Sequence, residues 1–487
     1  MSKRAIVIGA GIGGLATSVR LAHKGYTVEV FETNPYPGGK LSAFEDQGYR
    51  FDAGPSLFTM PHFVDALFEL VGENPRDHFN YKKKEIACQY FWPDSTRLTA
   101  YGDPEKFAAE VETKLQVPQD RLKKYLKRAQ RKYDRTAPLF LEKSLHKKST
   151  LLSADTLKAL ANLHRYDLLT SLHRTNQKQL KEPHLVQFFD RFATYNGSDP
   201  YQTSGMMTLV QHLEQAYGTF IPEGGMVQIT EAVYQLAKRM GVQFNFNSAV
   251  QAIRTEGNRA TGVQTATAFF PADLVISNMD IFPTYKRLLP KLKAPEHILK
   301  QERSSSAVIF YWGVERNFPE LDLHNILFSE DYKQEFQQIF KERSIAEDPT
   351  VYINISSKDV PEDAPEGGEN WFVMINTPAD HGQDWDELVT QLRTRVLAKV
   401  EQILGVSVAS FIRTETVLTP PLIQEKTQSY LGALYGASSN NAMAAFLRHP
   451  NFSRQLKNLY FCGGSVHPGG GIPLCLLSAK ITADLIP

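Results

Sequence analysis

The sequence contains little cysteine. There are three cysteines among 487 residues, and Cys88, Cys462 and Cys475 show no paired spacing. A disulfide framework and a zinc site are therefore not expected, and the composition indicates a reducing cytosol. No apolar run reaches about 18 residues, so we expect no segment that spans a membrane. No signal peptide is expected either, because the first four residues lead directly into an apolar strand.

Net charge is also nearly absent, at +1, but it is unevenly distributed along the chain. Residues 114–181 hold 17 Lys and Arg against 5 Asp and Glu, a net charge of +12, which leaves −11 for the remainder. Such an imbalance predicts a local anionic partner rather than a protein that is basic throughout. The length predicts about two to four domains, and the 42% hydrophobic content is ordinary for a globular protein.

The first forty residues carry the clearest pattern. Residues 5–8 are typical of a buried strand, residues 15–23 of a helix, and residues 26–31 of a second strand that ends at Glu32. The turn after the first strand has the spacing G-x-G-x-x-G, formed by Gly9, Gly11 and Gly14. The acid follows 18 residues after the third glycine, which is typical of a dinucleotide-binding unit.

Each part of this unit has a physical reason. Gly9 permits the tight turn, Gly11 lets a pyrophosphate approach the backbone, and Gly14 lets the helix pack closely on the strand. The helix N-terminus favours the negative charge of the phosphates. Glu32 can accept hydrogen bonds from a ribose diol and would repel a 2′-phosphate, which predicts an adenine dinucleotide other than NADP. The motif alone does not choose between FAD and NAD.

The C-terminal segment repeats this pattern. A strand over residues 458–462 leads into a glycine-rich loop over 463–471 and a helix over 472–485. A second glycine loop before a helix supplies backbone N–H groups and a positive helix end. A long cofactor such as FAD reaches from its adenine site to a second site near the flavin, which an NAD-only protein does not need. We therefore expect the two ends of the chain to meet around one cofactor.

Five segments together resemble the carotenoid desaturases of the bacterial phytoene desaturase type, within the flavin amine oxidase superfamily. These segments are residues 7–15, 37–40, 52–56, 222–226 and 458–473. The stretch His-Pro-Gly-Gly-Gly-Ile-Pro at 467–473 is the most telling, because it separates carotenoid desaturases from ordinary amine oxidases. Its Gly-Gly-Gly-Ile-Pro-Leu form is similar to that of the hydroxycarotenoid 3,4-desaturase subgroup.

The resemblance implies an α/β fold. It would have a Rossmann-like FAD-binding domain of the glutathione-reductase and amine-oxidase type, with an inserted substrate domain of sheet and helices. We expect a discontinuous FAD-binding domain from residues 1–80, 220–290 and 415–487. Residues 81–219 are then a largely helical region that faces the substrate and the membrane, with a helix continuing over 151–172, and residues 291–414 form the sheet and helices of the substrate domain.

FAD is the implied cofactor, and no metal is implied. The implied FAD-binding residues are Gly9, Gly11, Gly13 and Gly14 for the pyrophosphate, Glu32 for the ribose, Gly39 and Lys40 beside the cofactor, Val250 for the adenine, and Gly464, Ser465, Gly471 and Ile472 for the ribityl chain and flavin. Relatives commonly carry arginine where this chain has Lys40. Lysine keeps the charge but loses the two-pronged hydrogen-bonding geometry of arginine.

The implied reaction removes a hydride and a proton from a C–C bond beside a polyene, with the flavin as hydride acceptor. A protein base is optional, since an allylic cation is acidic enough for water or the reduced flavin to take the proton. His467 is the first catalytic candidate, and ordering of its loop by hydrogen bonds is the alternative role. Arg191 and Tyr195 are weaker candidates, for which a structural role is favoured.

A carotenoid substrate must come from a bilayer, which gives the basic segment a purpose. The residues expected to rest on anionic headgroups are Lys123, Lys124, Lys127, Arg128, Arg131 and Lys132. A solvated helix face is the alternative, and no nucleic-acid motif accompanies the patch. We thus expect a cytoplasmic protein held peripherally on the inner face of the cell membrane. Its oligomeric state stays open.

Other activities remain compatible with these residues. They are phytoene desaturation, flavin-dependent carotene isomerisation, oxidation of an amine, and carotenoid binding without catalysis. An isomerase would share the fold but produce no net oxidation. A binding protein would retain FAD as a structural element only.

Overall fold

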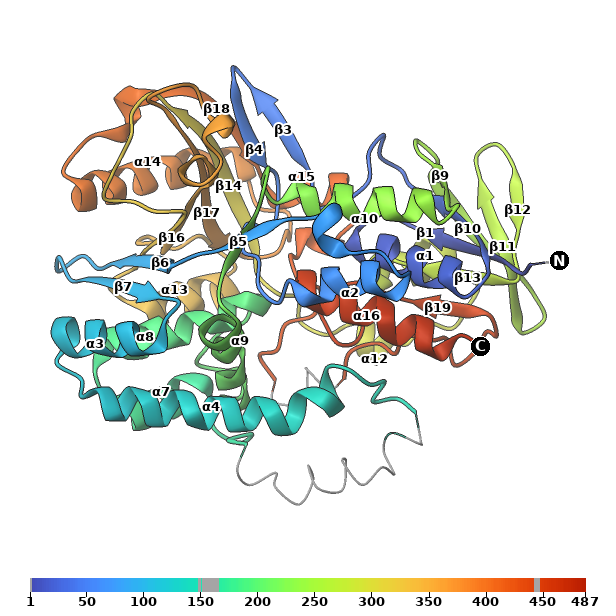
Figure 1. The fold of residues 1–487 in the computed structure, drawn as a ribbon, viewed down its shortest axis with the longest axis horizontal. Coiled ribbons are helices and arrows are strands. Elements are labelled where there is room, and N and C mark those ends of the chain that lie inside the picture. Colours follow the sequence, from blue (N-terminus) through green and yellow to red (C-terminus); the bar gives the residue numbers. More distant parts are fainter. Residues whose placement is uncertain (1, 148–149, 151–165, 442–446) are drawn as a thin grey trace.

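The computed structural model describes residues 2–147, 150, 166–441 and 447–487. Most of the helix expected over 151–172 therefore lies outside the described residues. Two sheets lie side by side in Figure 1, with both chain ends beside the first sheet and a group of helices beneath the second.

The first sheet is parallel, in the order β19-β13-β1-β2-β9. Its strands are β1 (Arg4–Ile8), β2 (Thr27–Phe31), β9 (Gln243–Asn245), β13 (Leu274–Ser277) and β19 (Leu459–Phe461). Residues 5–8 and 274–277 are buried along their whole length, as expected for strands that are covered on both faces. Strands from three remote parts of the sequence thus form one sheet.

Helices cover this sheet. They are α1 (Ile12–His23), α2 (His62–Leu70), α10 (Val227–Arg239) and α16 (Ile472–Leu485). α1 packs against both α10 and α16 through apolar side chains such as Leu15, Val19 and Ala479. An antiparallel sheet of β10 (Val250–Glu256), β11 (Arg259–Thr265) and β12 (Phe269–Pro271) lies at the end of the molecule near the N-terminus.

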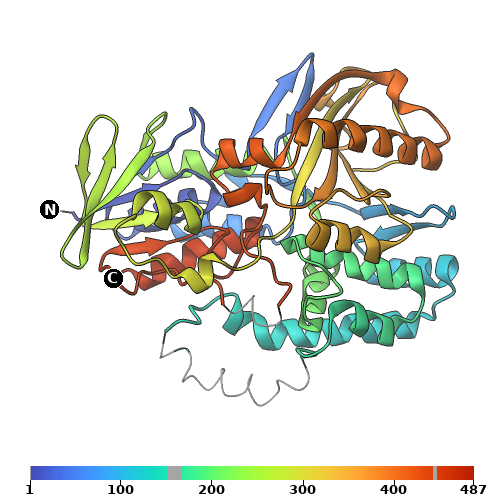
Figure 2. The same cartoon turned by 180° about the vertical axis from the view of Figure 1, so that it is seen from behind.

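The second sheet has the order β18-β14-β17-β16-β15-β6-β7. Its strands are β6 (Ile86–Phe91), β7 (Arg97–Tyr101), β14 (Ser306–Val314), β15 (His324–Leu327), β16 (Val351–Ile355), β17 (Glu369–Thr377) and β18 (Ile412–Leu418). On β14, Val308, Phe310 and Trp312 pack toward α14 (Trp385–Leu404), which covers the outer face of the sheet in Figure 2. The residues between them point to the other face, because successive side chains alternate along a strand.

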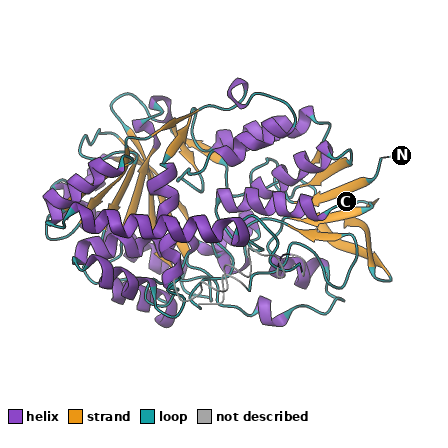
Figure 3. Cartoon of the chain, turned by 60° about the horizontal axis from the view of Figure 1, so that its bottom comes forward, coloured by secondary structure: helices purple, strands orange, loops and turns teal. Residues whose placement is uncertain are grey.

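Helices from the middle of the chain lie against the second sheet. They are α3 (Pro104–Leu115), α4 (Gln119–Phe140), α7 (Leu172–Leu180), α8 (Pro183–Asp190) and α9 (Val210–Tyr217). α4 runs along the lower side of the molecule and comes to the front in Figure 3. Leu122, Tyr125 and Ala129 form its buried face, as their spacing predicts.

The remaining elements are short. They are β3 (Ala43–Asp46), β4 (Tyr49–Asp52), β5 (Tyr81–Lys83), β8 (Phe220–Pro222), α11 (Ile281–Pro283), α12 (Glu296–Leu299), α13 (Tyr332–Gln337) and α15 (Pro420–Thr427). One feature was not expected: β6 and β7 lie within the range predicted to be largely helical, yet β6 pairs with β15 of the second sheet. Burial of Tyr90 and Phe91 between sheet and helices accounts for this placement. The exact domain limits stay a prediction.

Candidate cofactor and substrate cavity

One cavity of about 1000 Å³ joins the two sheets. At one end it is lined by Gly11, Glu32 and Val250, at the carboxyl ends of the first sheet's strands. At the other end it is lined by Cys88, Arg191 and Tyr352, beneath the second sheet. This volume is at the top of the usual range for small-molecule sites. The position agrees with the rule that open parallel sheets bind ligands at the carboxyl ends of their strands.

The N-terminal glycine turn forms the wall at the first end. α1 begins at Ile12 with Gly11 as its N-cap, and no side chain caps the helix. The first N–H groups of the helix are therefore available for an anion. Gly9, Gly11 and Gly13 line the cavity, whereas Gly14 does not. A Cβ at Gly14 would overlap the carbonyl oxygen of Gly9, so this glycine serves the packing of helix on strand.

Glu32 lies at the end of β2 and is almost fully buried while still lining the cavity. Its carboxylate accepts a hydrogen bond from the backbone N–H of Ala10 at 2.7 Å and another from that of Asn34 at 2.9 Å. The acid therefore braces the glycine turn from within, a role that the sequence did not reveal. Its position at the cavity wall is the one predicted for contact with a ribose.

The two glycine loops meet, although Gly463 follows Gly14 by 449 positions in the sequence. A Cβ at Gly13 would lie 3.1 Å from the Cα of Gly463 and 2.7 Å from Asn278 Oδ1, so a side chain there would crowd this approach. α16 begins at Ile472, directly after Gly471, whose φ of +104° favours glycine. Gly464, Ser465, Gly471 and Ile472 all line the cavity. The expectation that both chain ends meet at one site is thus met by the geometry.

Asn278 lies between these loops and was missed as a site residue. Its side chain faces Gly11, Gly13 and Gly463, and it lines the cavity. The amide Nδ2 would lie 2.9 Å from a Cβ at Gly11. The signal available in the sequence was a polar residue directly after the buried strand over 274–277, at the carboxyl end where ligands bind.

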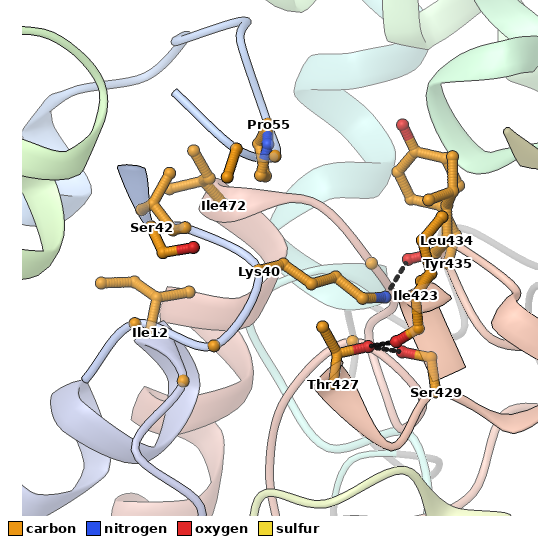
Figure 4. Close-up of a pocket in the computed structure, with 18 of the residues that line it drawn as sticks. Ile12, Lys40, Ser42, Pro55, Ile423, Thr427, Ser429, Leu434, Tyr435 and Ile472 are labelled. Carbon is orange, nitrogen blue, oxygen red and sulfur yellow. Dashed lines mark hydrogen bonds between the residues drawn. The ribbon is translucent and has the colours of Figure 1, made fainter. Parts of the chain in front are cut away.

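Lys40 projects across the cavity from the loop that follows Gly39 (Figure 4). Its Nζ donates a hydrogen bond to the carbonyl oxygen of Leu434 at 2.8 Å. Burial lowers the pKa of this ammonium group. The side chain thus brings its ammonium group beside Leu434 and Tyr435 in Figure 4.

These residues fit a flavin dinucleotide. Two helix N-termini without side-chain caps border the cavity, at Ile12 and Ile472. Backbone approaches closely at Gly13 and Gly463, where Asn278 is the side chain that faces both glycines. A buried acid and a buried cation, Glu32 and Lys40, also line the cavity.

The inner face of the second sheet makes the other wall apolar. The apolar side chains that line it are Ile309 and Tyr311 from β14, Ile326 from β15, Phe372 and Met374 from β17, and Leu418 from β18. They alternate along each strand with residues that pack toward the outer face. This wall suits a long apolar molecule rather than a small polar one.

Arg191, Tyr195 and Glu214 form a polar group within this apolar half, which we call the Arg191 cluster. All three side chains line the cavity. The hydroxyl of Tyr195 donates a hydrogen bond to Glu214 Oε2, and Arg191 Nη2 lies 3.6 Å from the same oxygen. Arg191 and Tyr195 were expected as weak candidates, whereas no motif pointed to Glu214.

A second polar group consists of Ser56, His324 and Tyr352. The Tyr352 hydroxyl lies 2.7 Å from His324 Nδ1 and 2.8 Å from Ser56 Oγ. Burial lowers the pKa of His324 to about 3, so its imidazole is neutral at neutral pH. Burial likewise raises the pKa of the nearby Cys88 thiol to about 12. These residues were missed, because single polar positions on strands carry no motif.

His467, the first catalytic candidate, is not among the residues that line the cavity. Its Nε2 lies 3.0 Å from the carbonyl oxygen of Lys143, on the far side of the glycine loop. Its own carbonyl accepts hydrogen bonds from Asn451 at 2.8 Å and Ser478 at 2.9 Å. Burial lowers the pKa of the imidazole to about 4. This setting fits the alternative role, in which His467 orders the loop.

Comparisons with known proteins agree with this geometry. Residues 12–487 match the model of a family described as flavin containing amine oxidoreductase. The chain is 55% identical over 485 residues to a 1-hydroxycarotenoid 3,4-desaturase of Flavobacterium sp. (strain P99-3), covering 100% of this chain and 99% of the relative. It is 31% identical to a phytoene desaturase of Fusarium fujikuroi, covering 100% and 89% of the two chains. Among solved structures, wild-type putrescine oxidase bound to putrescine is similar in fold, with a TM-score of 0.64, 15% identity, and coverage of 100% and 99%.

Proposed function

The chain belongs to the flavin containing amine oxidoreductase family, and from this premise we propose that it desaturates the 3,4 bond of a 1-hydroxylated carotenoid. The flavin and the oxidoreductase class that the sequence predicts are confirmed by the family, and FAD is the cofactor. One observation carries the proposal most directly: a single cavity runs from the dinucleotide turn to the apolar face of the second sheet. Cofactor and long apolar substrate would therefore meet inside the protein.

The residues of the chain hold and shield the reactants. Bound FAD supplies the acceptor for the hydride that leaves the substrate. Gly11, Gly13 and the start of α1 would hold the pyrophosphate, and Glu32 would hold the ribose. The apolar wall would align the polyene and exclude water from the reacting bond. His467 would order the 463–471 loop from behind, without touching the substrate.

Substrate delivery would take place at a membrane surface. No helix among the described residues is long and apolar enough to cross a bilayer. On α4, however, Lys124, Lys127 and Arg131 are exposed, and this helix runs along the lower side of the molecule in Figure 1. Each basic residue near anionic lipid contributes about 1 kcal/mol. We place peripheral docking on this face of α4.

Three residues of the basic segment have other roles. Arg128 is exposed but forms an ion pair with Asp167 at 2.8 Å. Lys132 is buried, and its Nζ lies 2.6 Å from Asp167 and 2.8 Å from Thr208 Oγ1. It shares the inner face of α4 with Tyr125 and Ala129, as a helical repeat requires. Lys123 is partly exposed and pairs with Glu105 at 2.6 Å. The docking surface is therefore narrower than the sequence suggested.

Product analysis tests the proposal. The flavin-loaded protein is incubated with a 1-hydroxycarotenoid in liposomes, and pigments are followed by absorbance and mass. We expect a red-shifted chromophore that has lost two hydrogens. An isomer of unchanged mass would identify an isomerase instead, and tight binding without conversion would identify a binding protein. Either result would overturn the proposed reaction.

A further inference from the structure

The Arg191 cluster has an incomplete set of hydrogen bonds. The side chains of Arg191 and Glu214 are only 11% and 3% exposed. Among the described residues, nothing hydrogen-bonds to Arg191 Nε, to Arg191 Nη2 or to Glu214 Oε1. The 3.6 Å between Arg191 Nη2 and Glu214 Oε2 is an ion pair but is too long for a direct hydrogen bond. A donor and an acceptor therefore remain available in a buried place.

Buried polar groups of this kind lower the stability of the fold unless a ligand or another group hydrogen-bonds to them. A buried polar group without a partner costs about 1–3 kcal/mol, and a charged one more. Aromatic rings hold the guanidinium in place, with its carbon 4.7 Å from the ring centre of Phe192, 5.2 Å from Tyr90 and 5.3 Å from Tyr195. The Tyr195 hydroxyl occupies Oε2 of Glu214 and leaves Oε1 free. All three residues of the cluster line the cavity, and the atoms without partners are themselves buried.

The free atoms define the chemistry of the ligand. A group that accepts a hydrogen bond from Arg191 and donates one to Glu214 must be both an acceptor and a donor, as a hydroxyl is. A carboxylate would be repelled by Glu214, a carbonyl could satisfy Arg191 alone, and a hydrocarbon end would satisfy neither. An alcohol is therefore the end group that completes the cluster.

The cluster and the cofactor loops are linked by residues that line the same cavity. Arg191, His324 and Tyr352 all line the cavity. Tyr352 contacts Ser56, and the loop that holds Ser56 packs on the backbone of Lys40, since a Cβ at Gly54 would overlap the Lys40 carbonyl. A hydroxyl at C1 is only a few bonds from the 3,4 bond. The position thus suits a hydroxyl held while that bond lies near the flavin.

We propose that Arg191 and Glu214 bind the 1-hydroxyl group of the substrate, and that they determine the preference of the enzyme for hydroxylated carotenoid ends. This inference rests on the proposed function and deepens it. Arg191 donates to the hydroxyl oxygen, and Glu214 Oε1 accepts its proton in a hydrogen bond. Sites that hydrogen-bond a substrate hydroxyl reject the analogue without it strongly, because their own polar groups are then left unpaired.

A pair of substrates tests this assignment. The flavin-loaded wild type, Glu214→Gln and Arg191→Lys are assayed with a 1-hydroxycarotenoid and with the same carotenoid lacking the hydroxyl. We expect each substitution to lower the ratio of the two kcat/KM values at least tenfold, mainly through slower turnover of the hydroxylated substrate. A purely structural role would lower both values alike and leave their ratio unchanged.

The controls separate the possible failures. Glu369→Gln alters another buried carboxylate, one that does not line the cavity, and should keep the wild-type ratio. The flavin spectrum and the melting temperature verify the fold of each variant. If Glu214→Gln does not fold, Arg191→Lys alone tests the assignment. A wild type that ignores the hydroxylated carotenoid would overturn the proposed function. If the wild type prefers the hydroxylated carotenoid and the variants keep its ratio of kcat/KM values within about twofold, the proposed function stands. The assignment of Arg191 and Glu214 to the hydroxyl group would then be wrong.

Discussion

The Glu32 carboxylate accepts the backbone N–H of Ala10 at 2.7 Å and so ties the end of β2 to the glycine turn after β1. The same carboxylate lines the cavity at its cofactor end. One acid therefore serves two purposes: it fixes the conformation of the turn, and it faces the expected position of the ribose. Removal of this side chain should lower both the free energy of unfolding and the affinity for the cofactor.

Glu32→Ala should lower FAD affinity about 10- to 100-fold and destabilise the protein by about 1–3 kcal/mol, since two buried N–H groups lose a charged acceptor. The ratio of flavin absorbance to protein absorbance measures the first effect, and urea unfolding measures the second. Glu29→Ala is the matched control, because Glu29 lies on the same strand but pairs with the exposed Arg4. Equal flavin content in both variants would contradict the role of Glu32.

Gly11→Val should abolish flavin retention while leaving the melting temperature of the flavin-free protein within a few degrees of the wild type. The reason is that a side chain at Gly11 meets only the movable amide of Asn278 before it enters the cavity. Gly14→Ala should instead lower the melting temperature itself, because its Cβ overlaps the backbone of Gly9. A yellow Gly11→Val protein with full flavin content would refute the assignment.

Reversing charge on the outer face of α4 should weaken membrane binding. The double variant Lys124→Glu/Lys127→Glu is expected to sediment less with anionic liposomes at low salt, with an unchanged melting temperature, since both residues are exposed. Lys238→Glu/Arg254→Glu carries the same change of charge on α10 and β10, and should bind like the wild type. If the two double variants sediment equally, α4 is not the docking surface.

Stability should fall as the pH drops from about 6.5 toward 4. Burial lowers the pKa of His467 to about 4, whereas an imidazole in the unfolded chain titrates near 6.5. The unfolded state binds more protons within this window, so acid favours unfolding, by up to about 3 kcal/mol for this one residue. Above about pH 6.5 the full contribution of His467 is present.

Urea unfolding between pH 7 and pH 4.5 measures this effect. His467→Gln should show a shallower decline of the unfolding free energy, with the remaining slope due to other buried histidines such as His324 and His449. His23→Gln, at an exposed position, should keep the wild-type slope. An unaltered slope in His467→Gln would show that the imidazole is not held neutral by the fold.

The cofactor half of the molecule was readable from the sequence because its signals are local. Buried strands of a parallel sheet are continuous apolar runs, and the glycines of a phosphate turn stand at fixed spacings. Gly11, Glu32 and Gly471 could therefore be placed without knowledge of the rest. Asn278 was within reach by the same rule, as a polar residue at the carboxyl end of a buried strand.

The substrate half could not be read in this way. β6 pairs with β15, whose residues are more than 200 positions away in the sequence. The residues around Tyr90 carry no local pattern that predicts this pairing. Glu214 becomes a site residue only because α9 packs beside Arg191. His467 faces Lys143 rather than the cavity, since side-chain direction in an irregular loop follows no period.

The contact between Gly13 and Gly463 has a consequence for biosynthesis. A ribosome that has made the first half of this polypeptide has produced only one side of the nucleotide pocket. The other side follows only with β19 and α16, more than 400 residues later in the chain. The pocket is therefore complete only after these two elements have been made and have joined the first sheet.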